Sequence, residues 1–439
     1  MLDPDISARD ALRHLHVPDD DAPEAVGRRQ FLRLLGMGVG AGLAGGVFGS
    51  SLLDPLLAGH DPSAWAQGPI GAHDGVLVLV GLYGGNDGLN TSVPITDGNY
   101  YSQRGSLAIS PQRALPVNAS TGLHPQLTKL QQFWNSGQLA IVEGVGYANP
   151  DFSHFNSLGY WMGGRPNTRS STGWLGRWLD GYLAGRRDLF AAAHVGSSLP
   201  LTLIGAASRG TTVPAATPKF GADATLADRH VSNALRAMRT TTAGTWQNLV
   251  SGAIVDALDV GKTLAPKVPS AGMATGPLST QMEVAARLIN ANIGFRVVTT
   301  GFHDFDQHAD LPNEHSARMA ELNAGITRFF QVLDPSWASR VTVATFSEFG
   351  RTSWANQSLG TDHGSAAPQL VFGRNVKGGI YGQRPSLAGL SRWARMGHHV
   401  DFRSYYASLL DGWMGGGSST VLGGTFADLG LFRTGPGNA

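Results

Sequence analysis

The sequence predicts an α/β fold with a mostly parallel sheet, and three observations carry this prediction. Short apolar runs rich in β-branched residues alternate with amphipathic stretches, which is the pattern of strand–helix–strand units. The run at 75–83, GVLVLVGLY, is apolar at successive positions, as expected of a strand buried on both faces of a parallel sheet. Many of the 59 glycines directly follow apolar runs, where a tight turn after a strand favours a residue without Cβ.

The same alternation continues along the chain. The segment 207–279 differs, because it is rich in Ala, Thr, Ser and Gly, and we interpret it as a helical insertion or cap with amphipathic pieces at 230–238 and 245–258. Residues 67–439 are otherwise expected to form one domain. The expected helices are 126–136, 283–293, 314–333 and 402–414, and the further strands are 139–145, 295–300, 340–346 and 369–372.

The first 66 residues have the layout of a twin-arginine export signal and linker. The motif RRQFLR at 28–33 precedes a Gly-rich apolar run at 34–48, which is shorter than the roughly 20 residues of a permanent membrane span. A small-x-small cleavage motif, Ala-Trp-Ala, follows at 64–66. We therefore expect the twin-arginine translocase to export the folded chain to the periplasm, the cell surface or the medium. The alternative is a buried helix that follows a basic patch.

Charge and cysteine content narrow the possible functions. The 33 Lys and Arg residues balance 32 Asp and Glu residues, so no net field favours nucleic acid or an anionic membrane. The chain has no cysteine, which excludes disulfides and thiolate metal sites. Any metal must therefore be held by imidazole, carboxylate, amide or hydroxyl groups.

Residues able to ligate a divalent metal occur in four loops that follow predicted strands. Ligands bind beyond the carboxyl ends of the strands in open α/β sheets, so these loops are expected to share one site. The densest loop is 303–310, where two histidines and three aspartates lie within eight residues. Imidazole and carboxylate ligands favour zinc or manganese, although magnesium and calcium stay open. The expected ligands are Asp87, Asp304, Asp306, His308, Glu348, Asp362 and His363.

Two further residues are candidates for the reaction itself. Ser153 lies at the predicted start of a helix, where backbone amides and a metal would favour its hydroxyl as a nucleophile. The alternative is that Ser153 only caps the helix. Arg351 follows Glu348 by three residues, and its guanidinium suits bidentate recognition of phosphate or sulfate oxygens. Its alternative role is that of a structural partner of Glu348.

The order of these motifs resembles the DUF1501 family of uncharacterised twin-arginine-exported proteins. Besides the leader, the motifs are Gly-Gly-Asn-Asp-Gly-Leu-Asn at 84–90, Ser-His-Phe at 153–155, Asp-x-His at 306–308, Phe-Ser-Glu-Phe-Gly-Arg-Thr at 346–352 and Thr-Asp-His-Gly at 361–364. The family is similar to the alkaline phosphatase and sulfatase superfamily. This resemblance implies a doubly wound sheet with helices on both faces, a hydroxyl nucleophile and two metals at the carboxyl edge of the sheet.

The resemblance also implies roles for single residues. Asp87 matches the first metal-binding aspartate and Ser153 the nucleophile. The central Asp and His pair is matched by His308 with either Asp306 or Asp304, whose spacings from His308 both fit, and the last histidine is matched by His363.

One position departs from the superfamily pattern. Glu348 falls where an Asp-His pair holds the second metal, and Phe349 occupies the place of that histidine. The second metal is therefore expected to be weakly held, replaced or missing unless Asp362 or His154 takes this place.

The function implied by the resemblance is an exported hydrolase that uses one or two divalent ions. Its substrate would be a phosphate or sulfate ester, either a small molecule or a group on a polymer. The alternative is a non-catalytic exported binding or surface-assembly protein on the same fold, and Phe349 is the observation that motivates it.

Overall fold

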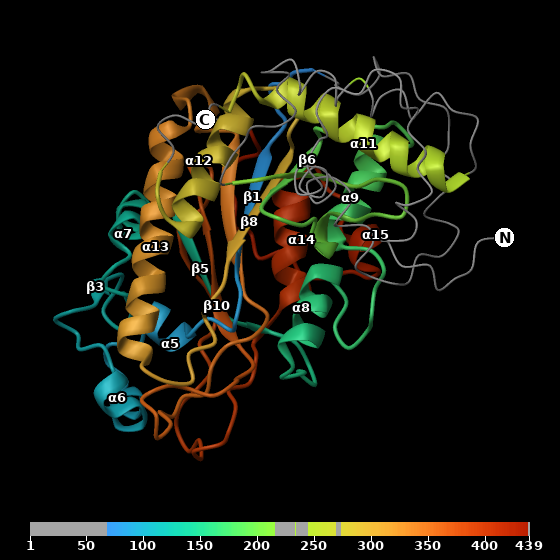
Figure 1. The fold of residues 1–439 in the computed structure, drawn as a ribbon. Coiled ribbons are helices and arrows are strands. Elements are labelled where there is room, and N and C mark those ends of the chain that lie inside the picture. Colours follow the sequence, from blue (N-terminus) through green and yellow to red (C-terminus); the bar gives the residue numbers. More distant parts are fainter. Residues whose placement is uncertain (1–67, 216–232, 234–244, 269–273, 438–439) are drawn as a thin grey trace, which may run out of the picture.

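A mixed, mostly parallel sheet forms the centre of the structure (Figure 1). The computed structural model describes residues 68–215, 233, 245–268 and 274–437. The predicted export signal lies outside the described residues, as does the predicted helical piece 230–238 apart from residue 233. The strands are β1 (Val76–Leu82), β2 (Ser92–Val93), β3 (Leu115–Pro116), β4 (Gly122–Leu123), β5 (Leu139–Gly146), β6 (Ala192–Val195), β7 (Thr211–Val213), β8 (Val297–Phe302), β9 (Val341–Phe346), β10 (Ala367–Phe372), β11 (Gly379–Gly382) and β12 (Val400–Asp401).

Helices connect most of these strands. The helices are α5 (Gly88–Thr91), α6 (Gly98–Arg104), α7 (Thr128–Asn135), α8 (His154–Gly163), α9 (Trp174–Leu183), α11 (Thr245–Leu264), α12 (Pro277–Asn290), α13 (Leu311–Val332), α14 (Phe402–Gly412) and α15 (Ser418–Leu422), with short 3₁₀ turns at Gly105–Leu107, Leu201–Leu203 and Pro335–Trp337. The helix predicted at 283–293 begins earlier, because Pro277 occupies the first turn of α12 and its fixed φ suits a helix start.

The predicted α/β class with a mostly parallel sheet is confirmed by the strand pairing. The order is β11-β5-β10-β9-β1-β8-β6-β7, and β12 lies beside β5. The central strand β1 pairs in parallel with β8 and β9, so that Val78 faces Val298 on one side and Val343 on the other. Among the described strands of this sheet, β10 alone runs antiparallel to its neighbours, β5 and β9. The carboxyl ends of β1, β5, β8 and β9 therefore meet at one edge, where β10 begins.

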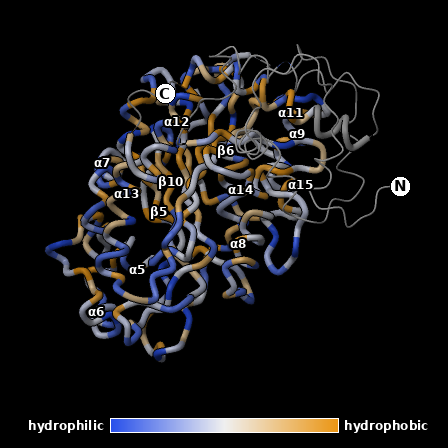
Figure 2. Tube along the Cα trace, viewed as in Figure 1, coloured by the Kyte–Doolittle hydropathy of each residue, from blue (hydrophilic) through white to orange (hydrophobic). Residues whose placement is uncertain are grey.

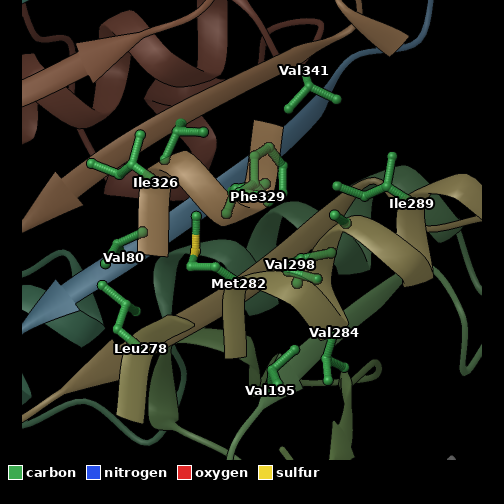
Figure 3. Close-up of a cluster of buried hydrophobic side chains, with 14 of the residues drawn as sticks. Val80, Val195, Leu278, Met282, Val284, Ile289, Val298, Ile326, Phe329 and Val341 are labelled. Carbon is green, nitrogen blue, oxygen red and sulfur yellow. The ribbon is translucent and has the colours of Figure 1, made fainter. Parts of the chain in front are cut away.

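Helices cover both faces of the sheet, as the resemblance implies. Alternate residues of β1 enter two separate apolar cores: Val78 and Val80 belong to one, Leu77 and Leu79 to the other. Helices α7, α12 and α13 pack over the first face, and α8, α9 and α14 over the second (Figure 1). Figure 3 shows part of the first core, in which Met282 lies among side chains from the sheet and α13.

The colouring by hydropathy agrees with this arrangement. Apolar residues concentrate along the strands and the inner helix faces, whereas polar residues are frequent in the loops at the end of the sheet near α5 and α6 (Figure 2). The side chains able to carry chemistry are thus placed at one edge of a rigid, doubly covered sheet.

The segment predicted as an insertion, 207–279, includes part of the main sheet. Strand β7 lies within it and pairs in parallel with β6, and the segment also contains α11 and the start of α12. Residues 216–232, 234–244 and 269–273 of this segment lie outside the described residues. In the described part of the chain, none of the helices has the length and apolar character needed to cross a membrane.

Candidate metal centre

Three histidines and one aspartate converge at the carboxyl edge of the sheet. His154 opens α8 after β5, Asp306 and His308 lie in the loop after β8, and His363 lies shortly before β10. The Nε2 atom of His363 lies 3.0 Å from Nε2 of His154 and 3.0 Å from Nε2 of His308. The Asp306 carboxylate reaches all three rings, at 3.3 Å from His154, 3.0 Å from His308 and 3.1 Å from His363.

The other ring nitrogen of each histidine is held by an oxygen. His154 Nδ1 lies 2.8 Å from Glu348 Oε1, and His308 Nδ1 lies 3.2 Å from Asp362 Oδ1. His363 Nδ1 lies 2.8 Å from the carbonyl oxygen of Phe152. A carbonyl or an ionised carboxylate only accepts, so each Nδ1 carries the proton and donates it. In the neutral rings, the Nε2 lone pairs of His154 and His308 are then free on the side of His363 and Asp306, as in sites where carboxylate or carbonyl oxygens orient metal-binding imidazoles.

This donor set fits a single divalent metal. Ligands placed about 2.1 Å from a tetrahedral zinc lie about 3.4 Å from one another, which is close to the separations seen here. Among the described residues, one ligand atom each from His154, Asp306 and His363 can be chosen so that all lie within 4.8 Å of one another. His308 lies outside this mutually close group of three, but its Nε2 atom is 3.0 Å from Asp306 Oδ1 and 3.0 Å from His363 Nε2, which makes it the candidate fourth donor. Three imidazoles and one carboxylate favour zinc or manganese over calcium.

The charges around the centre adjust the protonation of its members. The hydrogen bond that His154 donates to Glu348 raises the pKa of His154 against the effect of burial, whereas burial lowers the pKa of His363. Burial alone would raise the pKa of Asp306, but the hydrogen bond and charge of Arg351 outweigh it and lower this pKa to about 2. Asp306 is therefore an ionised donor at neutral pH.

Arg351 is built into the support of the centre. Its side chain is fully buried, and Nη2 lies 2.6 Å from Asp306 Oδ1. The guanidinium also donates to carbonyl oxygens from three loops: those of Gly84, Gly85, Phe305 and Thr361. These contacts orient Asp306 and tie the loops together. The alternative role, that of a partner of Glu348, is not seen: in the described part of the chain, no hydrogen bond or ion pair joins Arg351 to Glu348.

Glu348 and Phe349 are the two residues for which the sequence predicted a departure at the second metal position. Glu348 is buried, and its Oε1 atom accepts from His154 Nδ1 and from the backbone N–H of Gly84 at 2.8 Å. The Phe349 ring is buried between His154 and His363, with ring centres 4.7 and 4.8 Å away. Gly85 has φ +76°, and a Cβ built there would lie 2.6 Å from the Phe349 ring. Glu348 thus holds the ring of His154, and an apolar ring fills the adjacent space.

Asp87 is placed outside this cluster. Its side chain is fully buried and forms a bidentate ion pair with Arg104, at 2.6 and 3.0 Å. It also caps α5 through Asn90 N and accepts from Thr361 Oγ1 at 3.2 Å. Burial opposes ionisation, but Arg104 outweighs it and lowers the pKa of Asp87. Sequence reasoning missed Arg104, which stands at the end of a short helix without a motif.

The loop 303–310 divides its polar residues between the centre and the surface. Asp304 is exposed and pairs with Arg318 at 3.2 Å, and Asp310 accepts from Asn313 at 2.8 Å. The His303 ring lies against Tyr83. Of the two aspartates that sequence reasoning left open, Asp306 enters the cluster and Asp304 does not.

Ser153 lies between two residues of the centre. It follows Phe152, whose carbonyl holds His363, and precedes His154. It is the N-cap residue of α8, yet its Oγ lies 3.5 Å from Asn156 N, which is long for a hydrogen bond. The hydroxyl is on an exposed residue and is only loosely held by the cap. His154, which sequence reasoning considered only as a substitute for the missing histidine, is a central member of the site.

Removing the carboxylate behind His154 tests the role assigned to it. We expect Glu348→Ala to weaken metal binding by about 10- to 100-fold, because the ring loses the acceptor that fixes its tautomer and orientation. Competition with a chromophoric chelator measures the affinity. Asp304→Ala removes an exposed carboxylate from the neighbouring loop and should leave it unchanged. Equal affinities for the wild type and Glu348→Ala would contradict the assignment.

Comparison with known proteins identifies a family. The model of a family described as protein of unknown function (DUF1501) matches residues 139–401, which is more than half of the chain and includes all members of the metal centre. No curated protein matches the chain.

Several solved structures are similar to this chain, at low sequence identity. A protein in the alkaline phosphatase superfamily from Vibrio parahaemolyticus is 10% identical, with 77% of this chain and 72% of that chain covered and a TM-score of 0.33. PsFucS1 sulfatase from Pseudoalteromonas sp. is 9% identical, with 82% and 70% covered and a TM-score of 0.35. Ps i-CgsB in complex with k-i-k-neocarrahexaose is 10% identical, with 82% and 75% covered and a TM-score of 0.36. At these scores the likeness carries no information about chemistry.

Proposed function

Since the chain belongs to the DUF1501 family of proteins of unknown function, its activity has to follow from its own site, and we propose a metal-dependent hydrolase of phosphate or sulfate esters. The observation that carries the proposal is the convergence of three imidazole Nε2 atoms and the Asp306 carboxylate, with every outer ring nitrogen already held by an oxygen. A bound divalent metal would supply a Lewis acid that stabilises negative charge on the ester and on an attacking oxygen.

The proposed role of each residue follows from the position of its side chain in or beside the cluster. His154, His363 and Asp306 would hold the metal, with His308 as the proposed fourth ligand, while Arg351 fixes Asp306. Ser153 is the proposed nucleophile, because its hydroxyl stands at the start of α8 beside His154 and is loosely capped.

The reaction takes place in two displacements. The Ser153 Oγ forms a bond to phosphorus or sulfur while the bond to the ester oxygen breaks. The ester oxygen leaves with the electron pair and takes a proton from water, and the serine proton is lost to solvent. Water then attacks the serine ester, releases phosphate or sulfate and restores the hydroxyl.

An activity assay with chelation tests this proposal. We expect the purified full chain to hydrolyse an aryl phosphate or an aryl sulfate, to lose the activity on removal of divalent ions and to recover it with zinc or manganese. Circular dichroism before and after chelation shows whether the fold is kept. If the folded, metal-loaded protein hydrolyses neither ester class, the proposed hydrolase function is contradicted.

A second candidate function is favoured by two specific observations. Phe349 fills the place expected for a second-metal ligand, and Asp87 is engaged with Arg104 away from the cluster. A centre with one metal suits an exported binding or surface-assembly protein that uses the ion for structure. The variant Ser153→Ala distinguishes the two functions, because it would lower kcat of the hydrolase by about a thousandfold but would leave a binding protein unaffected. The export motif at 28–48 supports a location outside the cytoplasm for either function.

A further inference from the structure

An anionic substrate at this centre needs a cationic side chain with unoccupied donors. The metal centre itself contains three carboxylates, from Asp306, Glu348 and Asp362, so an approaching phosphate or sulfate meets negative charge as well as the metal. Arg351 cannot relieve this, because its guanidinium is buried and donates to Asp306 and to four backbone carbonyls.

Arg395 combines a fixed position beside the centre with free donors. Its Nε atom donates to the carbonyl oxygen of His363 at 3.0 Å, and its guanidinium carbon lies 3.8 Å from the centre of the Phe152 ring. Phe152 and His363 are themselves joined, since the Phe152 carbonyl accepts from His363 Nδ1. In the described part of the chain, neither terminal nitrogen of Arg395 has a hydrogen-bond or ion-pair partner.

The segment that carries Arg395 is fastened to the loops of the site. It connects β11 to β12, and the buried Met396 accepts through its carbonyl from Ser365 Oγ, two residues after His363. Trp354 Nε1, from the loop between β9 and β10, donates to the Leu390 carbonyl at 2.9 Å. The backbone next to Arg395 is therefore anchored on the same elements that place the metal ligands. An ordinary solvated surface arginine has no such support.

We propose that Arg395 binds the anionic group of the substrate through its two terminal nitrogens, a role that rests on the proposed hydrolase function. With Nε and the face of the guanidinium already used, the remaining edge presents parallel N–H groups, which match two oxygens of a phosphate or sulfate. Preorganisation on Phe152 and His363 lowers the side-chain entropy lost on binding. Arg395 is in this view a specificity residue for tetrahedral oxyanions.

Anion binding measured separately from turnover tests the role. Titration calorimetry of inorganic phosphate and sulfate into the metal-loaded full chain is compared for the wild type, Arg395→Ala, Arg395→Lys and Arg392→Ala. We expect the dissociation constant of the preferred anion to rise by about 10- to 100-fold in Arg395→Ala, with partial recovery in Arg395→Lys. Arg392→Ala removes an exposed arginine three residues away and should bind as the wild type does. Metal content is measured in all four proteins. If the contact between Arg395 and His363 had only a structural role, the metal content of Arg395→Ala would fall.

The outcomes separate this role from the function on which it rests. Anion binding that depends on Arg395 in a protein without turnover would support the anion site and overturn the hydrolase. Turnover with unchanged KM and unchanged anion affinity in Arg395→Ala would overturn the role of Arg395 and leave the hydrolase standing. Absence of anion binding in the metal-loaded wild type, or loss of metal from Arg395→Ala, would also overturn it.

Discussion

Replacing Ser153 by alanine is expected to lower kcat on the preferred aryl ester by about a thousandfold while the metal content stays at the wild-type level. The hydroxyl forms the covalent bond in the proposed reaction, whereas the metal ligands come from other residues. The loss should fall on kcat rather than KM, because the substituted group acts only as the bond forms. Steady-state kinetics and elemental analysis on the same preparations measure both quantities.

A matched control keeps this test specific. Thr168→Ala removes a hydroxyl from the exposed loop that follows α8 and should leave both parameters unchanged. The N-cap contribution of Ser153 is expected to be small because its bond to Asn156 N is 3.5 Å long, so Ser153→Ala should also unfold near the wild-type midpoint. A kcat within about twofold of the wild type would remove Ser153 from the reaction.

Breaking the buried ion pair between Asp87 and Arg104 should have the largest effect on stability. Arg104→Met is expected to lower the free energy of unfolding by about 3–5 kcal/mol, because it leaves the carboxylate buried without its cation. The carbonyl oxygens of Ser353 and Thr352 would lose their donor as well. Chemical denaturation followed by circular dichroism measures the change.

Two further variants show whether the loss of stability comes from the buried charge. Arg113→Met changes an exposed arginine after the same helix and should alter stability by no more than about 0.5 kcal/mol. Adding Asp87→Asn to Arg104→Met removes the uncompensated charge and should restore part of the loss, which the double-mutant cycle quantifies. A loss below about 1 kcal/mol in Arg104→Met would contradict a structural role for the pair. Asp87→Asn alone should retain metal, since Asp87 lies outside the cluster.

The fold and part of the site could be predicted from the sequence, and the reason is physical. A strand buried on both faces leaves a continuous apolar run, so β1, β5 and β9 were recognisable, and the loops after them had to meet at one edge of a parallel sheet. The same reasoning, applied to β8 and its loop, predicted that Asp306 and His308 share this edge with His363, and the structure brings the three side chains together.

Some of the predicted ligands have other partners in the structure, and these partners are distant in sequence. Nothing local distinguishes a member of the cluster such as Asp306 from a buried ion-pair partner such as Asp87, because the difference is made by Arg104, seventeen residues away from Asp87. Glu348 looks like a ligand in sequence, yet in the structure it holds the ring of His154. Arg351 and Arg395 are both arginines near the site, and only the tertiary structure shows that one is buried and the other exposed.

The central claim is that His154, Asp306, His308 and His363 hold one divalent metal, and elemental analysis of the purified full chain tests it most directly. We predict about one zinc or manganese ion per folded chain. His363→Ala should lose it, and His303→Ala should retain it because this ring lies against Tyr83 in the same group of loops. A wild-type protein that is folded and binds no metal when supplied with zinc or manganese, or equal metal content in His363→Ala and the wild type, would contradict the account.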